Sequence, residues 1–142
     1  MFIGRYRHTI DEKGRVSIPA KFREELGETV VITESVDGRC LYVFSMDEYA
    51  VKFKNMNDIA FSDDDENKAA RYMGALSTYS DIDKQGRIII PQEFRSDVEL
   101  VRDVVILGAF SRVEIWNSDK WEEYFKETSN SDIRSAFKKV GL

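Results

Sequence analysis

The clearest pattern of apolar and polar residues is a pair of short β-branched segments on either side of a polar turn. Residues 7–10 and 16–18 are β-branched or alternate in polarity, as half-buried strands do. The turn between them spans residues 11–14, Asp-Glu-Lys-Gly. Its aspartate can accept a bond from the backbone two residues on, and its glycine adopts a positive φ without steric penalty. The pattern predicts a β-hairpin.

A short helix is predicted directly after this hairpin. Pro19 ends the second strand and suits the first turn of a helix, where its missing N–H is not needed. The helix should cover residues 20–26, with Gly27 as its stop. Apolar residues at helical spacing predict four more helices, which we interpret as core or subunit contacts. They span residues 46–56, 63–76, 119–127 and 132–140.

The hairpin and its helix occur twice. Residues 10–23 (IDEKGRVSIPAKFR) and 82–95 (IDKQGRIIIPQEFR) are identical at eight of fourteen positions, and both prolines of the chain sit at matching places, 72 residues apart. The second copy of the helix runs from Gln92 to about Val98 and lacks the glycine stop. The two halves remain weakly similar in sequence after this motif. Each half is therefore predicted to be strand, turn, strand, short helix, strand, turn, strand, longer helix.

This duplication gives an α+β chain with three expected segments. Residues 1–56 hold the first repeat and its following helix, residues 57–76 form a linking helical segment, and residues 77–142 hold the second repeat with the C-terminal helices. The composition is that of an ordinary globular protein, 42% hydrophobic and 33% charged. We find no secretion signal and no apolar run long enough to cross a bilayer.

The charge is unevenly distributed. The whole chain has a net charge of −5, but residues 1–23 hold six basic and two acidic side chains and the remaining residues are strongly acidic. A basic block on an acidic body could orient the protein on nucleic acid, or it could be chance clustering on a solvated face.

The residues do not favour an enzyme or a metal protein. His8 is the only histidine, and no serine, cysteine or lysine has an obvious base partner. The acids Asp81 and Asp83 have no further ligand at metal-binding spacing, and we expect no cofactor and no small-molecule substrate. The single cysteine, Cys40, reads as a buried residue of a strand and suits a reducing cytoplasm.

The repeated motif resembles a known family. Asp-x-x-Gly-Arg, a β-branched strand, proline and a helix with Phe-Arg resemble the AbrB-type swapped-hairpin regulators. A tandem copy opened by Met1-Phe2-x-Gly4 is similar to the MraZ family over nearly the whole chain. The resemblance implies two interleaved swapped-hairpin β-α-β halves, related by a pseudo-twofold axis, that form a small β-barrel-like core with flanking helices.

The resemblance also implies a function. It is that of a cytoplasmic, nucleoid-associated regulator, which we expect to act as a repressor. Such a protein forms a homo-oligomeric ring of about eight or more subunits and binds repeated short boxes of double-stranded DNA ahead of the cell-division and cell-wall gene cluster. An oligomeric scaffold or an antitoxin-like interaction module is the alternative.

The resemblance implies that DNA is contacted by the arginine after each turn and the arginine of each short helix. Asp11, Gly14, Asp83 and Gly86 are expected to hold the turns. From the residues alone, the arginines after the turns could equally be structural partners of these aspartates. With the neighbouring basic residues, the expected DNA contacts are Arg5, Arg7, Lys13, Arg15, Lys21, Arg23, Lys84, Arg87 and Arg95.

The two copies are not equivalent. Lys13 of the first copy is replaced by Gln85 in the second, and Lys21 by Glu93, so we expect the first copy to dominate DNA binding. Residues 88–90 are isoleucine and therefore apolar on both faces of a strand. Because such a strand is usually covered on both faces, we expect Ile89 to pack on a neighbouring subunit.

Overall fold

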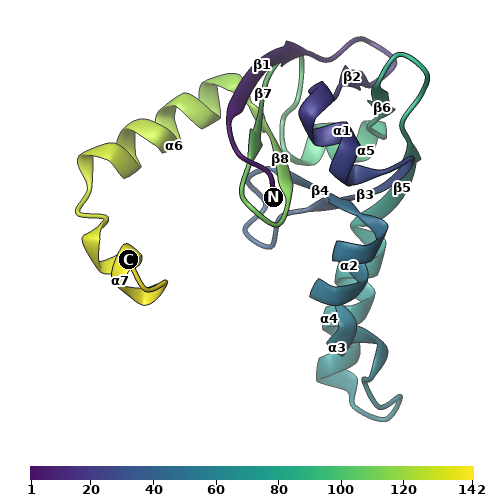
Figure 1. Ribbon diagram of the computed structural model, residues 1–142. Helices are drawn as coiled ribbons and strands as arrows, with labels where there is room; N and C mark the ends of the chain where they lie inside the picture. The colour runs from purple at the N-terminus through teal and green to yellow at the C-terminus, as the bar shows by residue number, and fades with distance from the viewer.

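The computed structural model describes residues 1–142 and shows a mixed α+β fold (Figure 1). Both halves follow the predicted order of strands and helices. The first half consists of β1 (Arg5–Thr9), β2 (Arg15–Ser17), α1 (Ala20–Leu26), β3 (Thr29–Glu34), β4 (Leu41–Ser45), α2 (Met46–Lys52), α3 (Lys54–Asn57) and α4 (Asp64–Ala75). The second consists of β5 (Ser77–Asp81), β6 (Arg87–Ile89), α5 (Gln92–Asp97), β7 (Asp103–Gly108), β8 (Val113–Asn117), α6 (Ser118–Asn130) and α7 (Arg134–Lys139).

Six strands form one antiparallel sheet in the order β1-β7-β8-β4-β3-β5. Each strand has a counterpart in the other half: β1 and β5, β3 and β7, β4 and β8. Replacing every strand by its counterpart gives the same order read backwards, so the topology has an internal twofold symmetry. The first strand of each half pairs with the other half, β1 with β7 and β5 with β3. The two remaining strands, β2 and β6, pair only with each other. Neither half therefore completes a sheet without the other.

The prediction of a local hairpin is correct for the turn but wrong for the two strands, which do not pair with each other. The turn forms, with the amide of Gly14 donating to the carbonyl of Asp11 and the amide of Asp11 donating to the carbonyl of Arg15. After the turn the two strands diverge, because β1 joins β7 in the large sheet and β2 joins β6. A turn signal shows where the chain reverses, but it does not identify the strand that supplies the long-range hydrogen bonds.

The main core lies between the large sheet and a layer made of α1, α5 and the β2–β6 pair. It is a cluster of 19 buried residues to which both halves contribute matching side chains, such as Phe22 and Phe94 from the short helices. The rings of Phe2 and Tyr6 meet the Phe22 ring edge-on, with centroids 5.6 and 5.4 Å away. This layer keeps the β2–β6 pair fixed above the sheet.

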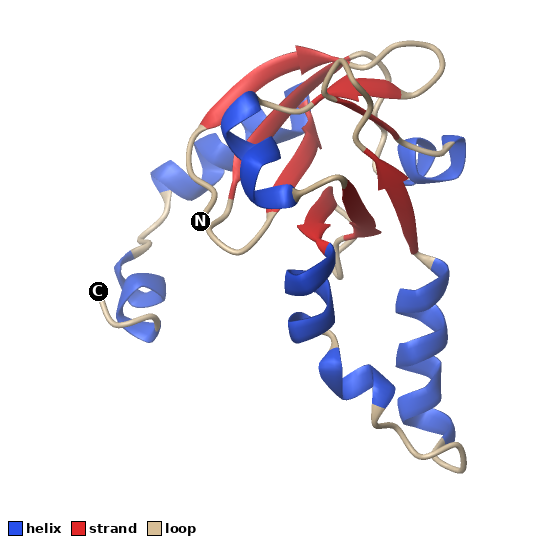
Figure 2. Ribbon diagram, turned by 45° about the vertical axis from the view of Figure 1, so that its right-hand side comes forward, coloured by secondary structure: helices blue, strands red, loops and turns tan.

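The opposite face of the sheet is covered by aromatic residues from α2 and α6. Trp121 and Tyr124 of α6 pack on Trp116, with ring centroids 5.3 and 5.0 Å away. Tyr49 of α2 packs in the same way on Phe44, at 5.9 Å. In Figure 2 the helical hairpin α2–α3–α4 and the α6–α7 segment project from the sheet as two arms. None of the helices has the length and apolarity needed to cross a bilayer.

Several predicted bounds differ from the structure. The helix expected over residues 46–56 breaks at Phe53, whose φ of −107° and ψ of 21° leave the helical region while its ring packs on Tyr49 at 4.6 Å. Helix α6 extends to Asn130, whereas α7 is shorter than expected at both ends. Cys40 is buried as predicted, but it lies just before the strand that begins at Leu41.

Candidate nucleic-acid interface

The β2–β6 pair, which we call the ribbon, brings the two copies of the repeated motif together. Val16 faces Ile88 at its centre, and both side chains are buried in the core. Because side chains alternate along a strand, the residues on either side of this pair point away from the core. We call this the outer face of the ribbon; it consists of Arg15, Ser17, Arg87 and Ile89.

The first turn is held by Asp11. Its Oδ1 accepts the backbone N–H groups of Lys13 at 3.0 Å and Arg15 at 2.9 Å, and its Oδ2 accepts Nε of Arg15 at 2.6 Å. These bonds, the backbone N–H of Arg15 first among them, hold the pKa of the Asp11 carboxyl below its ordinary value. The aspartate therefore stays ionised and fixes both the turn and the arginine.

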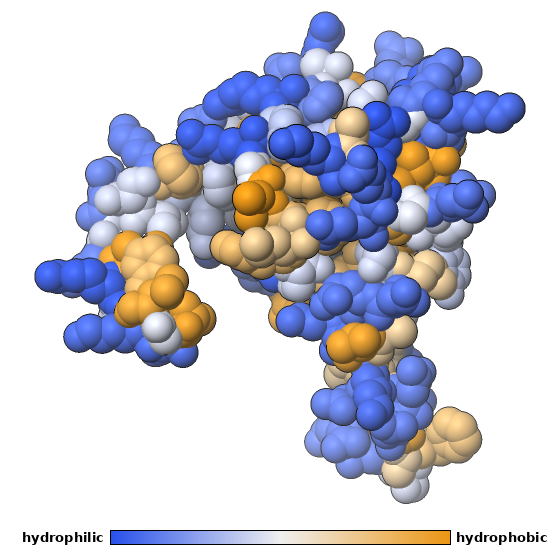
Figure 3. Space-filling model, in the orientation of Figure 1, coloured by the Kyte–Doolittle hydropathy of each residue, from blue (hydrophilic) through white to orange (hydrophobic).

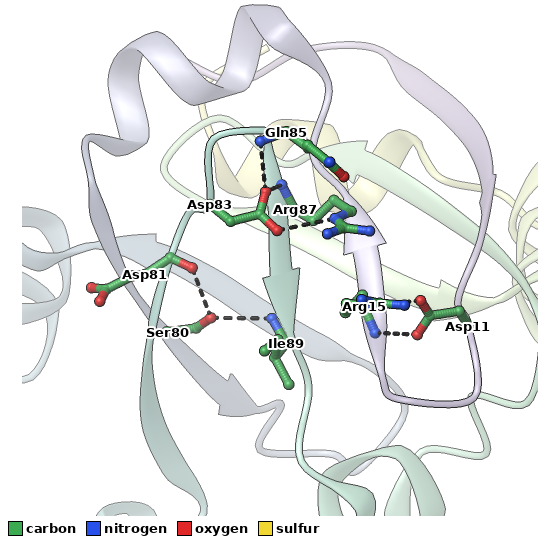
Figure 4. Close-up of polar contacts among 8 residues, drawn as sticks. All are labelled: Asp11, Arg15, Ser80, Asp81, Asp83, Gln85, Arg87 and Ile89. Atoms are coloured by element: carbon green, nitrogen blue, oxygen red, sulfur yellow. Dashed lines mark hydrogen bonds and ion pairs between the residues drawn. The ribbon is translucent and has the colours of Figure 1, made fainter.

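The second turn repeats this geometry (Figure 4). Oδ1 of Asp83 accepts the N–H groups of Gln85 and Arg87, both at 2.9 Å, and Oδ2 accepts Nε of Arg87 at 3.0 Å. The backbone bond from Arg87 is the main cause that lowers the pKa of the Asp83 carboxyl. In both turns the aspartate engages only Nε, and no hydrogen bond within the chain uses the terminal Nη groups of Arg15 or Arg87.

The helix arginines lie against the turn of the opposite copy. Arg95 donates from Nε to the carbonyl of Ile90 at 3.0 Å and from Nη1 to the carbonyl of Glu12 at 3.4 Å. Its guanidinium lies so close to Gly14 that an added Cβ would be 3.0 Å from Nε, and the Arg23 guanidinium lies closer still to Gly86, with Cζ 2.7 Å from an added Cβ. The sequence did not predict that the helix arginine of each copy packs on the turn glycine of the other copy. The only signal was that both copies have an arginine at this position of the helix. The predicted DNA contacts of these two arginines stay predictions.

The lysines around the ribbon are exposed. Lys13 and Lys84 lie in the two turns, and Lys21 lies on the solvent side of the first turn of α1. Figure 3 shows hydrophilic residues over most of the upper surface, where β1, β2 and β6 lie, whereas apolar residues gather on α7. The ribbon and its turns thus present cationic groups on a polar surface.

Two predicted contacts lie elsewhere. Arg5 and Arg7 of β1 stand opposite Leu107 and Val105, which face α6 rather than the ribbon. Arg7 pairs with Glu122 and donates to Oγ of Ser118, while the Arg5 guanidinium lies 4.7 Å from the centroid of the Phe125 ring. The structure therefore separates these two arginines from the ribbon by the thickness of the sheet. Their contact with DNA stays a prediction distinct from that of the ribbon.

Two Asp-x-x-Gly-Arg turns, whose following strands β2 and β6 pair in one ribbon, define a class of tandem-repeat proteins with a paired arginine face. The chain belongs to the MraZ family. The family model, described as "MraZ protein, putative antitoxin-like", matches residues 1–72 and again residues 73–140. The family predicted from the motifs is thereby confirmed.

Full-length relatives give the same result. The chain is 44% identical over 131 residues to "Transcriptional regulator MraZ" of Caldanaerobacter subterraneus, an alignment that covers 92% of this chain and 91% of the relative. It is 38% identical over 144 residues to the protein of the same name from Alkaliphilus metalliredigens, with both chains covered completely. The relative of that name from Moorella thermoacetica is 43% identical, with 92% and 90% covered.

Proposed function

We propose that the chain is a sequence-specific DNA-binding transcriptional regulator whose ribbon enters the major groove. The observation that supports this most is the convergence of the two motifs: Arg15 and Arg87 stand on one outward face with their terminal Nη groups unused. A two-stranded ribbon fits the major groove of B-form DNA, which is about 12 Å wide. The planar fork of an arginine matches the two acceptors of a guanine edge or a phosphate.

The aspartates that bind the two arginines are compatible with a DNA contact by the same arginines. The bond that Nε of Arg15 donates to Asp11 uses one edge of the guanidinium and leaves the Nη edge for a base. A side chain already held in place loses less conformational entropy on binding. The two interpretations of Arg15 that the sequence left open are therefore compatible, because the residue can be held by Asp11 and still bind DNA.

The finer parts of the proposal come from the family resemblance. We propose a nucleoid-associated, cytoplasmic repressor of the cell-division and cell-wall gene cluster, acting as a ring of about eight or more subunits on repeated boxes. A ring suits a chain with net charge −5, because several weak ribbons engaged at once raise the effective concentration of each. We further propose that the exchanged strands make an AbrB-like swapped hairpin. Three segments, residues 1–56, 57–76 and 77–142, would then divide the chain.

The test is binding to duplex DNA from upstream of the protein's own gene, measured by fluorescence anisotropy at several salt concentrations. Arg15→Ala should weaken binding about 10- to 100-fold per engaged subunit, since one arginine–guanine contact discriminates by about 1–3 kcal/mol. Arg87→Ala should weaken it less, because the first copy is the more basic. Arg7→Ala, on the far side of the sheet, tests the separate prediction for β1: if DNA contacts only the ribbon, this variant should bind as tightly as the wild type.

Light scattering must show the same oligomer for all three variants. Undiminished binding by Arg15→Ala would refute the ribbon as the DNA contact. A wild-type protein that binds no duplex DNA even at low salt would instead favour the alternative, a scaffold or an antitoxin-like module. A steep dependence on salt together with preference for the upstream sequence supports the regulator.

A further inference from the structure

The outer face of the ribbon departs from the internal symmetry of the fold. Its centre is the pair Val16–Ile88, two residues that occupy the same position in the two copies, 72 residues apart. The symmetry therefore relates Arg15 to Arg87, which preserves the arginine. It also relates position 17 to position 89, where a serine in one copy is replaced by an isoleucine in the other.

Because the strands are antiparallel, each arginine has a neighbour from the other copy. Arg15 stands directly opposite Ile89, and Arg87 stands directly opposite Ser17. Side chains of directly opposed residues lie about 5 Å apart and face the same side of the sheet. The ribbon thus has one end with an arginine beside an isoleucine, and another end with an arginine beside a hydroxyl.

Ile89 is 57% exposed on an otherwise polar face. Its strand is fixed on the other edge, where its backbone N–H donates to Oγ of Ser80 at 3.2 Å (Figure 4). It points to the same side as the free Nη groups of Arg15. Any surface that Arg15 contacts must therefore also cover Ile89, which makes DNA a better partner for this side chain than the neighbouring subunit that the sequence suggested.

We infer that Ile89 contacts the C5-methyl group of a thymine next to the guanine bound by Arg15, and that the Ile89/Ser17 difference acts with the unequal lysines of the two copies to orient the protein on its site. This inference rests on the proposed function. The thymine methyl is the apolar group that base edges present in the major groove, so an isoleucine there favours thymine. A serine hydroxyl both donates and accepts hydrogen bonds, so Ser17 beside Arg87 does not select one particular base at the neighbouring position.

The first experiment is selection of binding sequences from a random duplex DNA library by the full-length protein. The wild type should enrich an asymmetric motif with a fixed thymine beside one guanine. Ile89→Ser makes the two ends of the outer face alike, with arginine beside serine at both, and its motif should lose that thymine. Ser17→Ile is the converse variant and should add a second thymine at the symmetric place.

The second experiment removes the methyl group from the DNA. Replacing the selected thymine by uracil deletes only the C5-methyl, so the wild type should lose about three- to fivefold in affinity, as expected for one apolar methyl contact. Ile89→Ser should bind the thymine and uracil duplexes equally. Arg15→Ala is not used for this comparison, because it removes the guanine contact itself.

The outcomes separate the inference from the proposed function. If wild type and Ile89→Ser enrich the same motif, or if uracil binds the wild type as well as thymine does, the inference is wrong while DNA binding stands. If Ile89→Ser lowers the subunit number in light scattering, another copy of the chain covers Ile89 and the inference is also wrong. If the wild type enriches no sequence, the proposed function fails.

Discussion

Replacing Gly14 by alanine should destabilise the protein far more than an ordinary turn substitution. Gly14 has a φ of +84°, and an added Cβ would lie 2.4 Å from the carbonyl oxygen of Ile90. The two residues are also tied by a backbone bond, since the amide of Ile90 donates to the carbonyl of Gly14 at 2.8 Å. The clash is therefore with backbone and cannot be relieved by rotating a side chain. The substitution must push β2 away from the end of β6.

The expected loss of stability combines three effects. A positive φ costs a residue with a Cβ about 1–2 kcal/mol, and overpacking a dense site adds about 1–3 kcal/mol. Restricting the unfolded chain returns about 0.4–1 kcal/mol. The free energy of unfolding should therefore fall by about 2–4 kcal/mol, most of it from the clash.

Gly38→Ala is the matched control. Gly38 also has a positive φ, +70°, but nothing lies within 4 Å of an added Cβ, so this variant reports the backbone strain alone, about 1 kcal/mol. Urea unfolding followed by circular dichroism, at one protein concentration because assembly contributes to stability, gives both values. Equal losses for the two variants, within about 0.5 kcal/mol, would show that β2 and β6 are not held together at Gly14 as described.

Three further predictions follow from other contacts. Burial beside Asp97 raises the pKa of Glu34 to about 7, so wild-type stability should fall as pH rises toward 8, and Glu34→Gln should remove this fall in urea titrations at pH 5 and 8. The lowered pKa of Asp11 means that its stabilisation is lost as pH falls through the acid range; Asp11→Ala should unfold more easily at neutral pH and lose less on acidification. A Cβ on Gly108 would lie 2.3 Å from the Phe2 carbonyl carbon, so Gly108→Ala should abolish hydrogen-exchange protection of the Phe2 amide.

Much of the local structure could be predicted from the sequence. The turns, the short helices after Pro19 and Pro91, and α4 with its Asp63 cap follow from turn glycines, proline positions and helical spacing. The second short helix ends without a glycine because Glu99 takes the left-handed conformation, with a φ of 57°. The residues at that end did not predict this, since a glutamate gives no signal for a positive φ.

The partners of the strands could not be predicted from the residues alone. The alternation along β1 shows which side chains turn away from solvent, but not that β7, about a hundred residues away in the chain, lies beside it. For the same reason the basic residues 1–23 appeared to be one surface. The register places Arg5 and Arg7 beneath α6, whereas Lys13 and Arg15 lie at the ribbon. Basic residues that are close in the sequence therefore lie on two separate surfaces of the protein.

The exchange of strands has a consequence for synthesis on the ribosome. Strand β1 emerges well before its partner β7, which begins at Asp103. At about 5–20 residues per second, β1 waits some 5–20 s without its backbone hydrogen bonds. The exposed edge carries Arg5, Arg7 and His8, and such polar and charged side chains discourage pairing with other nascent chains during that interval. The large sheet therefore cannot form completely until the second half of the chain has been synthesised.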